Sequence, residues 1–566
     1  MLQQPAFVNA QKSYRFTPLV LLAIIVLGAA LRFYLIGSKG LWLDEAFSVW
    51  MGQQPLSDMF SWLLRIDHHP PLYYILLHFW IGLGDSAAVV RAFSALVGTL
   101  TIPVIYLVGR RLVNWKAGLL AALILALSPF HVRFAQETRM YTLLTFNAAI
   151  AILALAHLLT GTRSTTIPIG QQLLKFYQQW QTSGPYRQPL HLVKTDLAWL
   201  GLIIFTVATL LTHNTAIFFP LAINLFVFGL IIIHKFWPNN NEGQLQPPSL
   251  KNWMIAQVIT FLLWSPWLGA FVSQVIEVDR EFWIWEPDYD MVMGTLGTFL
   301  SAMLPDQIKS GGLVWYVYGL VLFLGVIYFR KQPAHIALLL ILFLTPFVGE
   351  LLVSLRRPIF YDRTLIWATI PLYLLLAAGL MQLRFQPFIV AGLAALIVFN
   401  SYSLHEYFYV FEKEEWDDAA AYVAEHVENE DLLLFNASWV QIPFDFYFRY
   451  YNRPVKKHGV PADLFDRGIL EPKMTRADLP RMVELTRDHR RVWLIYSHNW
   501  YTDPQNLIPV GLGRNLKLLD KQHFYGLEVH LYSARRLGCG QRPGPINQTY
   551  PGTTSEGQTG WVNDRR

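Results

Sequence analysis

The sequence predicts a polytopic α-helical membrane protein with a smaller soluble domain near its C-terminus. Of the 566 residues, 54% are hydrophobic and only 15% are charged, and the mean hydropathy is +0.32. One globular core does not accommodate a hydrophobic chain of this length, whereas a set of membrane spans does. The net charge of +6 is small for the length, so it indicates membrane topology and not a nucleic-acid partner.

Long apolar runs predict the spans, because about 20 apolar residues cross the hydrocarbon core. The first run lacks a clear small-residue cleavage site, so we expect an anchor and not a cleaved signal. A short run, Leu72 to Leu83, does not reach across, and we expect it along the outer surface. Eleven runs before Tyr402 are candidate spans: Pro18 to Ile36, Ala88 to Gly109, Ala117 to Val132, Tyr141 to Leu159, Leu197 to Leu211, Ala216 to Ile233, Trp253 to Val272, Leu313 to Phe329, Ala334 to Val353, Leu365 to Leu383 and Pro387 to Asn400.

The charges between these runs predict the orientation in the cell membrane. With Leu72 to Leu83 on the outer surface, one set of short loops collects most of the lysines and arginines, which is typical of the cytoplasmic side. The N-terminus is then cytoplasmic, and everything after Tyr402 is extracytoplasmic. The basic loops hold Lys12, Arg15, Arg110, Arg111, Lys116, Lys175, Arg187, Lys194, Lys235, Lys251, Arg330, Lys331 and Arg384.

The pattern changes after residue 402. An amphipathic helix pattern covers Trp416 to Val423, and apolar strand patterns cover Leu432 to Phe435 and Val492 to Tyr496. This alternation predicts a small α/β domain, and the Gly, Pro, Gln and Thr content beyond Arg536 indicates a disordered tail. We therefore expect a transmembrane domain at 1–402, an outer domain at 403–536 and a tail at 537–566. The single Cys539 excludes an intrachain disulfide.

Two acids follow the first span directly, at Asp44 and Glu45. Carboxylates at the edge of a bilayer either stay hydrated at a helix end or serve a function, and both interpretations are open for this pair alone. The sequence Asp67-His68-His69-Pro70-Pro71 follows, and His69 is a candidate to orient a substrate phosphate or hydroxyl.

Two further polar groups fall on the expected outer face. Glu137, Arg139 and Tyr141 stand between the third and fourth spans, where they can form a polar network facing a cavity, although interfacial anchoring explains Arg139 and Tyr141 equally well. Arg357 and Arg363 stand between the ninth and tenth spans, against the positive-inside bias, and guanidinium groups suit phosphate. The alternatives there are snorkelling and local pairing. The sequence His213-Asn214-Thr215 is expected in an outer turn, where contact with a substrate is one interpretation and a plain turn is the preferred one.

The order of these motifs resembles the GT-C superfamily, and more closely the bacterial relatives of dolichyl-phosphate-mannose protein mannosyltransferases, which include the aminoarabinose and galacturonosyl transferases of lipopolysaccharide. The resemblance is strongest from Leu31 to Leu159 and returns weakly from Arg357 to Pro371. Its motifs are Leu-Trp-Leu-Asp-Glu ending at Glu45, His-Pro-Pro-Leu-Tyr-Tyr beginning at His69, the span segment Arg91 to Gly98, and Gln-Glu-Thr-Arg-Met-Tyr ending at Tyr141.

This resemblance implies an enzyme that transfers a sugar from a polyprenyl-phosphate carrier to an acceptor at the outer face, usually with inversion. Asp44 holds the place of the first-loop acid and would be the general base. Glu45 would bind the acceptor or hold an arginine such as Arg91, and Glu137 would occupy the second acidic position.

The implied phosphate site consists of His69, Arg357 and Arg363. Carboxylates such as Asp44 and Glu137 are hard oxygen ligands, yet the resemblance implies a reaction without a metal or another cofactor. The implied partners are the lipid-linked donor, membrane lipids and an acceptor that is a protein, a lipid or a glycan.

Two other classes of protein compete with this interpretation. A flippase or transporter for a lipid-linked sugar also carries acids and arginines, but we find no paired repeat and no broken helix pattern at mid-membrane. A simple membrane anchor for the outer domain leaves the eleven spans and the outer polar groups unexplained.

Overall fold

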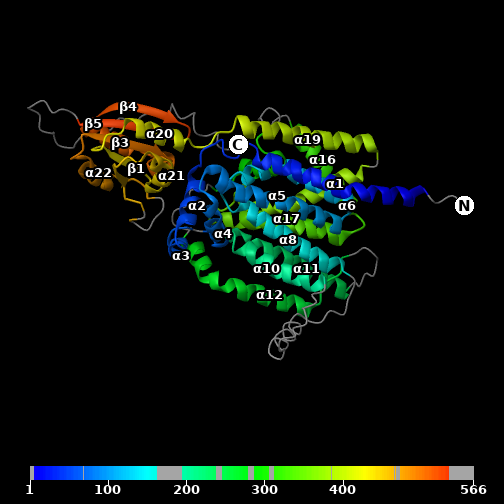
Figure 1. Cartoon of the computed structure of the whole chain (residues 1–566). Helices are drawn as coiled ribbons and strands as arrows, with labels where there is room; N and C mark the ends of the chain where they lie inside the picture. The colour runs from blue at the N-terminus through cyan, green and yellow to red at the C-terminus, as the bar shows by residue number, and fades with distance from the viewer. Residues whose placement is uncertain are drawn as a thin grey trace, which may run out of the picture. The chain divides into compact units, whose positions relative to one another are not determined.

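The structure of the protein is a computed structural model, which describes residues 5–67, 69–161, 194–236, 245–277, 286–304, 312–383, 385–464, 466 and 472–534. The chain forms two compact units (Figure 1). Residues 1–37 and 52–411 form the first, which we call the helical unit, and residues 38–51 and 412–566 form the second, which we call the sheet unit.

The helical unit is built from long apolar helices that run side by side (Figure 1). Helix α5 packs against α1, α6 and α8, and α8 in turn packs against α10. The main helices are α1 (Pro5–Phe33), α3 (Leu56–Arg65), α4 (Leu72–Trp80), α5 (Ala87–Leu112), α6 (Trp115–Leu127), α7 (Pro129–Ala135), α8 (Tyr141–Thr160), α10 (Lys194–Leu210), α11 (Phe218–Phe236), α12 (Leu250–Trp264), α13 (Leu268–Glu277), α14 (Tyr289–Ser301), α16 (Leu313–Tyr328), α17 (Pro333–Ser354), α18 (Thr369–Gln382) and α19 (Gln386–Tyr409). Short 3-10 helices η1 (Ile81–Leu83), η2 (Asn214–Ile217), η3 (Ser265–Trp267) and η4 (Asp362–Ala368) join some of them.

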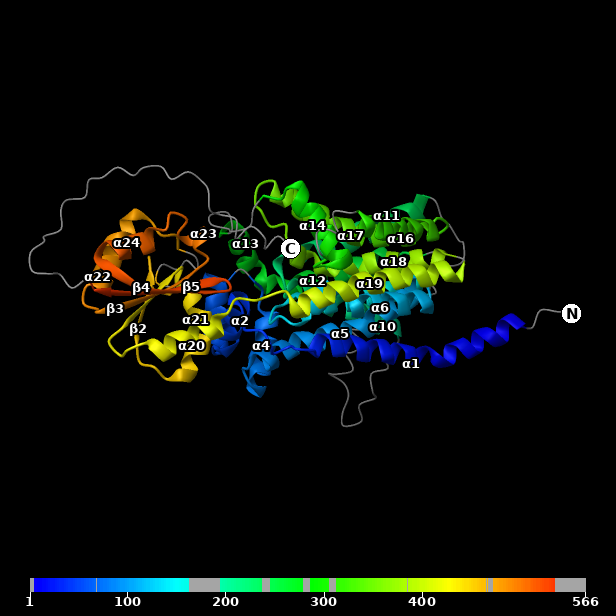
Figure 2. The same ribbon diagram turned by 90° about the horizontal axis from the view of Figure 1, so that it is seen from above.

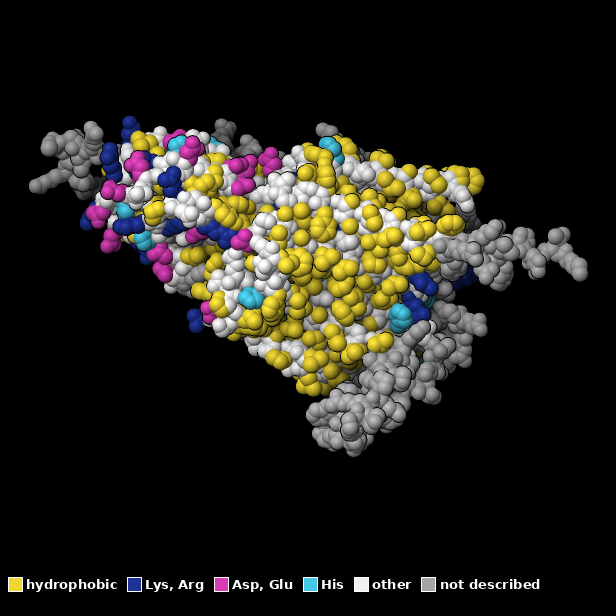
Figure 3. All heavy atoms as spheres, viewed as in Figure 1, with side chains coloured by type: hydrophobic (Ala, Val, Ile, Leu, Met, Phe, Trp, Pro, Cys, Tyr) yellow, Lys and Arg dark blue, Asp and Glu magenta, His cyan; other side chains and the backbone are white. Residues whose placement is uncertain are grey.

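Within the described residues, eight helices are long and apolar enough to cross a membrane, or up to nine if the bent pair of α6 and α7 is one span. The protein is thus a multi-pass membrane protein, and hydrophobic side chains cover the visible face of its helical unit (Figure 3). All the expected spans fall on helices, but those at 197–211 and 313–329 correspond to the shorter helices α10 and α16. The run at 72–83 forms the short α4 and η1, as expected.

The third expected span is not one straight helix, because α6 and α7 are bent by 58° at Ser128. Pro129 lacks a backbone N–H and cannot continue α6, while the Ser128 hydroxyl accepts the His131 N–H and starts α7. The buried Arg32 guanidinium donates to the carbonyls of Leu125 at 3.0 Å and Ala126 at 3.2 Å. Arg32 therefore satisfies carbonyls that the break leaves without helical partners, as a nonpolar environment requires.

The sheet unit holds a five-stranded sheet with the order β2-β1-β3-β5-β4. Strand β1 pairs in parallel with β2 and β3, and β5 pairs antiparallel with β3 and β4. The strands are β1 (Leu432–Asn436), β2 (Lys456–Val460), β3 (Arg491–Ser497), β4 (Leu516–Phe524) and β5 (Leu527–Ala534). The expected strands at 432–435 and 492–496 are confirmed as β1 and β3.

Helices lie on both faces of this sheet (Figure 2). Side chains alternate along a strand, so Leu433 and Phe435 pack toward α20 and α21 while Leu432 and Leu434 pack toward α22 and α24. The helices are α20 (Trp416–His426), α21 (Gln441–Phe448), α22 (Leu479–Thr486), α23 (Asn499–Thr502) and α24 (Leu507–Asn515), with short turns η5 (Ser438–Val440), η6 (Arg449–Tyr451) and η7 (Arg476–Asp478).

The two units divide at a different place from the expected boundary. Residues 402 and 403 lie inside α19, and the chain passes into the sheet unit after Phe411. The sheet unit also includes Ser38–Met51, which carries most of α2 (Leu43–Gln53). The tail expected at 537–566 lies outside the described residues.

Candidate functional site

Four connections of the helical unit bring polar side chains together. We call the group the His69 cluster. It draws on the α3–α4 connection, the α7–α8 connection with the start of α8, the end of the α10–η2 connection, and η4. Its members are Asp67, His69, Arg139, Tyr141, His213 and Arg363.

His69 is the centre of this group. Its Nδ1 lies 2.7 Å from the Asp67 carboxylate, and the Arg139 guanidinium lies 3.4 Å from its Nε2. Burial alone would raise the pKa of Asp67, but the His69 ring, the Arg139 charge and the Tyr74 hydroxyl outweigh it and lower that pKa. Asp67 is therefore ionised. Its carboxylate orients the His69 ring through the hydrogen bond at Nδ1, as carboxylates do for many catalytic histidines.

His213 faces His69 from the other side of the group. The two rings lie 5.4 Å apart, and the Tyr141 ring lies 6.2 Å from His213. Nδ1 of His213 accepts the Thr215 N–H, which leaves Nε2 to carry the proton of a neutral ring. Burial, together with the charges of His69, Arg139 and Arg363, holds the pKa of His213 well below its ordinary value of 6.5.

Arg363 adds a second guanidinium to the cluster. It stacks on the rings of Tyr361 at 4.6 Å and Tyr141 at 5.7 Å. Arg139 is buried, whereas His69 and Arg363 are half-buried. A ligand that reaches the cluster therefore meets His69 and Arg363 first, and a guanidinium fork with an imidazole N–H is suited to the oxygens of a phosphate.

The backbone of Arg139 is held from α5 and α4. The Ser94 hydroxyl donates to the Arg139 carbonyl and lies 3.3 Å from the Tyr73 hydroxyl.

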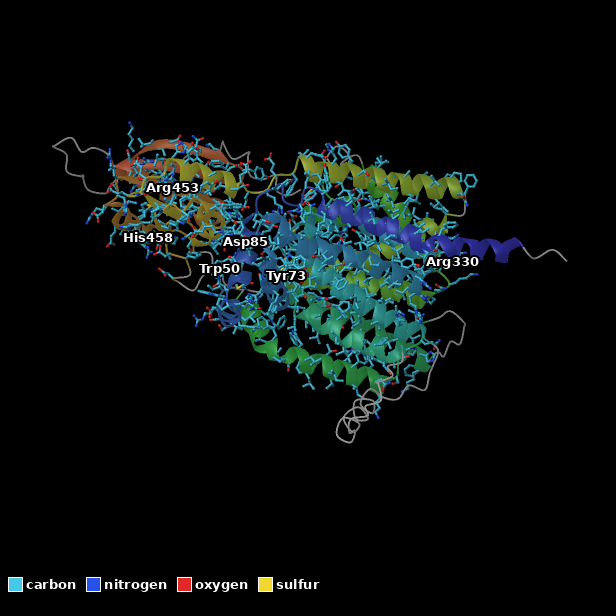
Figure 4. All side chains as sticks on the ribbon, viewed as in Figure 1. Trp50, Tyr73, Asp85, Arg330, Arg453 and His458 are labelled. Carbon is cyan, nitrogen blue, oxygen red and sulfur yellow. The ribbon has the colours of Figure 1, made fainter. Side chains whose placement is uncertain are left out.

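Tyr73 and Arg330, which lies in the α16–α17 connection, are toward opposite ends of the helical unit (Figure 4). The cluster and the basic loop at Arg330 thus belong to different ends of the helical unit, and their assignment to the outer and cytoplasmic sides stays a prediction.

Glu137 lies in the α7–α8 connection and is almost fully buried, at 1% exposure. Its Oε1 lies 3.4 Å from Nε of Arg133, one turn earlier on α7. Among the described residues, its Oε2 has no hydrogen-bond partner. A buried carboxylate oxygen without a partner is costly, so it is a candidate acceptor for a ligand's hydroxyl group.

Two further arginines that were predicted as phosphate or acid partners donate to backbone carbonyls. Arg357 donates to the carbonyl of Val275 near the end of α13. Arg91, in the first turns of α5, donates to the carbonyl of Ile36 at 3.0 Å. The predicted functions of these arginines remain predictions.

The acids that follow the first span belong to the sheet unit. Asp44 and Glu45 stand in the first turn of α2, where Asp44 is half-buried and Glu45 is fully buried. Oε2 of Glu45 accepts from Lys413 Nζ at 3.0 Å. Within this unit, Glu45 is therefore paired with a lysine of the C-terminal segment. The predicted binding of Glu45 to an arginine or to the acceptor stays a prediction.

The cluster contains four of the residues singled out by sequence, namely His69, Arg139, Tyr141 and Arg363. It also contains His213, which was expected in a plain turn. The available signal was a histidine at the outer end of an apolar run. Within the described ranges no group of three or more His, Cys, Asp and Glu side chains is arranged to hold a metal ion, and a metal-independent reaction stays a prediction.

Comparisons with known proteins give the fold a context. The sequence pattern of the family PMT_2, described as dolichyl-phosphate-mannose-protein mannosyltransferase, matches residues 68–168. No curated protein matches the chain significantly.

Solved structures match over nearly the whole chain. ArnT from Cupriavidus metallidurans bound to undecaprenyl phosphate has a TM-score of 0.56 at 11% identity, covering 90% of this chain and 97% of that one. The apo form of the same enzyme has a TM-score of 0.55 with the same identity and coverage. AglB, an oligosaccharyltransferase from Archaeoglobus fulgidus, in complex with an inhibitory peptide and a dolichol-phosphate, has a TM-score of 0.50 at 10% identity, covering 93% and 75%.

The segment 68–168 includes His69, Glu137, Arg139 and Tyr141, so the family pattern covers most of the predicted site on the helical unit. The chain is therefore a multi-pass membrane protein with the fold of the GT-C glycosyltransferases, and it resembles the ArnT-like members of that superfamily.

Proposed function

We propose that this protein is a polyprenyl-phosphate-sugar-dependent glycosyltransferase that acts at the outer face of the cell membrane. The single observation that carries the proposal is the His69 cluster, where two arginines and two histidines meet in a fold shared with ArnT bound to undecaprenyl phosphate. A lipid phosphate is the ligand that this set of donors suits best.

The proposed reaction needs a base and a site for negative charge. The acceptor hydroxyl attacks the anomeric carbon, its proton passes to the base, and the bond to the carrier phosphate breaks. A phosphate leaves without a dedicated acid, so cations that stabilise its growing charge supply most of the catalysis there. Arg139, Arg363 and His69 take this part, and Tyr141 lines the same group.

Asp44 is the proposed general base. Support comes from its place in the Leu-Trp-Leu-Asp-Glu motif and its half-buried position in the first turn of α2. Attack by the acceptor opposite the leaving phosphate inverts the anomeric centre. Glu137, with its Oε2 lacking a partner in the described part of the chain, is proposed to bind a sugar or acceptor hydroxyl.

The remaining parts of the proposal concern topology and partners. We propose eleven spans, counting the bent pair and the two shorter helices, with the N-terminus in the cytoplasm and the sheet unit outside. Arg91 and Arg357 are proposed to complete the donor site when the carrier is bound. The acceptor is a protein, a lipid or a glycan of the outer compartment.

Sugar transfer from defined donors tests the proposal. Membranes containing the protein are supplied with a panel of undecaprenyl-phosphate and dolichyl-phosphate sugars, and release of the free carrier phosphate is followed with time. We expect release from at least one donor, and a loss of about 100-fold or more in Asp44→Asn, as for removal of a general base.

Asp58→Asn is the matched control, because Asp58 is an exposed acid on α3 that accepts a local bond from Ser57. It should release carrier phosphate at the wild-type rate. Full activity of Asp44→Asn would overturn the base assignment. Movement of the donor across the membrane without release of carrier phosphate would overturn the transferase and favour a flippase.

A further inference from the structure

The segment that carries Asp44 is part of the sheet unit, although it follows the first membrane helix. Three contacts tie residues 38–51 to the C-terminal segment. Lys413 Nζ donates to Glu45 at 3.0 Å, the Leu43 N–H donates to Glu414 Oε2 at 3.0 Å, and the Leu41 N–H donates to the Tyr447 hydroxyl.

The pair of Glu45 and Lys413 is withdrawn from water. The Glu45 side chain is 0% exposed and that of Lys413 is 4% exposed. Buried ion pairs contribute little net stability because both charges lose their hydration, but loss of one partner leaves a buried charge without compensation. Such a pair selects one arrangement of the elements that carry it, here the rotation of α2.

Glu414 acts on the beginning of the same helix. The first N–H groups of a helix have no partner within it, and the Glu414 carboxylate accepts the first of them, that of Leu43. The same carboxylate is held by Trp416 Nε1 at 2.6 Å and by His498 Nε2 at 3.3 Å. A side chain distant in the sequence therefore caps α2, and it is itself fixed by the sheet unit.

These contacts determine where Asp44 points. Successive residues on a helix are about 100° apart around its axis, so Asp44 and Glu45 cannot face the same way. With Glu45 held inside by Lys413, Asp44 is turned to the half-buried side of α2.

We propose that Lys413 and Glu414 are positioning residues of the transferase, which fix the rotation and the first turn of α2 and thereby aim the Asp44 carboxylate. This inference rests on the proposed function, because it takes Asp44 to be the general base. It gives the sheet unit a part in the chemistry, and it explains why an acid directly after Asp44 is paired and buried.

The test compares kcat and KM for the donor in Lys413→Met, Glu414→Ala and Glu414→Gln. A misplaced base lowers kcat without changing how the donor binds, so we expect kcat to fall about 10- to 100-fold in Lys413→Met and Glu414→Ala with an unchanged KM. Glutamine keeps an oxygen that accepts the Leu43 N–H, so Glu414→Gln should recover most of the wild-type kcat.

Lys457→Met is the matched control. It breaks a lysine–carboxylate pair of the same unit, between Lys457 and Asp445 at 2.7 Å, which has no contact with α2 among those described. All rates are normalised to the amount of folded protein, which is measured by size-exclusion chromatography in detergent. If Lys413→Met does not accumulate, the pair Glu414→Ala and Glu414→Gln carries the test.

The outcomes separate this inference from the proposed function. A wild-type kcat per folded molecule in Lys413→Met and Glu414→Ala, with Asp44→Asn inactive, would overturn the positioning role alone. An equal loss in Lys457→Met would overturn it as well. Full activity in Asp44→Asn would overturn both the base assignment and this inference.

Discussion

At the scale of single residues, the most important feature is the unequal number of positive and negative charges in the His69 cluster. Asp67 is ionised and His213 is neutral, while the Arg139 guanidinium lies beside the His69 ring and the Arg363 guanidinium lies over the Tyr141 ring. Without a ligand this group carries an excess of positive charge. The phosphodiester of a lipid-linked donor carries one negative charge and gains a second as it leaves, and this charge compensates the excess, which is the physical reason for placing the carrier phosphate there.

Arg363 provides a test of that assignment. Arg363→Gln removes a charge from a half-buried, ring-stacked site, and charge-assisted hydrogen bonds contribute about 1.5 to 3 kcal/mol. We expect the KM for the lipid-linked donor to rise by about tenfold or more. Arg449→Gln is the control, because Arg449 also stacks on aromatic rings, 4.4 Å from Phe446, but in the sheet unit. Equal KM values in both variants and the wild type would contradict the phosphate role.

His213 predicts a sensitivity of the fold to acid. Its folded pKa is well below 6.5, whereas the unfolded ring titrates near its ordinary value, so the unfolded state binds more protons below about pH 6.5. Stability is therefore complete above that pH and is lost as the pH falls toward the folded pKa.

The measurement compares melting temperatures at about pH 7.5 and about pH 5.5. The difference between them should be smaller in His213→Gln than in the wild type, since glutamine does not titrate. His157→Gln, at an exposed position of α8, should keep the wild-type difference. An unchanged difference in His213→Gln would show that other groups cause the acid sensitivity.

At the scale of helices, close approach of backbones holds the helical unit together. Helices in lipid gain little from hydrophobic contact with each other, so they pack through small residues. A Cβ at Gly379 of α18 would lie 1.9 Å from the Val321 carbonyl oxygen of α16, and one at Gly325 would lie 2.3 Å from the Leu375 oxygen. These glycines let the two backbones touch.

Gly379→Ala should therefore separate α16 from α18. Because the methyl group meets a backbone oxygen and not a flexible side chain, we expect a cost at or above the upper end of the usual 1–3 kcal/mol for overpacking. Thermal unfolding in detergent measures it. Gly319→Ala on α16 is the control, since a Cβ there would meet nothing within 4 Å among the described residues. Equal melting temperatures for the two variants would refute the close packing.

At the scale of the whole molecule, the question is on which side of the membrane each part lies. The charge pattern predicts a cytoplasmic N-terminus and a sheet unit outside. The helices agree with this path only if α10 and α16, which are shorter than the other spans, also cross. One crossing fewer would move every later loop to the opposite side, so the orientation is a stringent test of the span count.

The sole cysteine, Cys539, is a natural probe of this topology. A membrane-impermeant maleimide should label Cys539 in intact cells, because the C-terminal segment is expected outside. In a Cys539→Ser background, Lys116→Cys should be labelled only after the cells are opened, since the exposed Lys116 stands in the first turn of α6, at the end of that helix expected in the cytoplasm. The reverse pattern would invalidate the predicted orientation.

The sequence by itself determined the class of the protein, its helices and four of the six members of the His69 cluster. Apolar runs and charge bias depend on local composition, so they revealed the spans and the strands at β1 and β3. Ordered motifs revealed His69, Arg139, Tyr141 and Arg363. These signals lie within short segments, and a single chain is enough to detect them.

Only the tertiary structure decided which distant segments meet. No local pattern marks His213 as a neighbour of His69, joins Glu45 to Lys413, or assigns residues 38–51 to the sheet unit. Likewise, no local pattern pairs Arg32 with the carbonyls of Leu125 and Ala126 at the bend after α6. Such pairings follow from packing and from the cost of burying polar groups without partners, and both are properties of the folded chain.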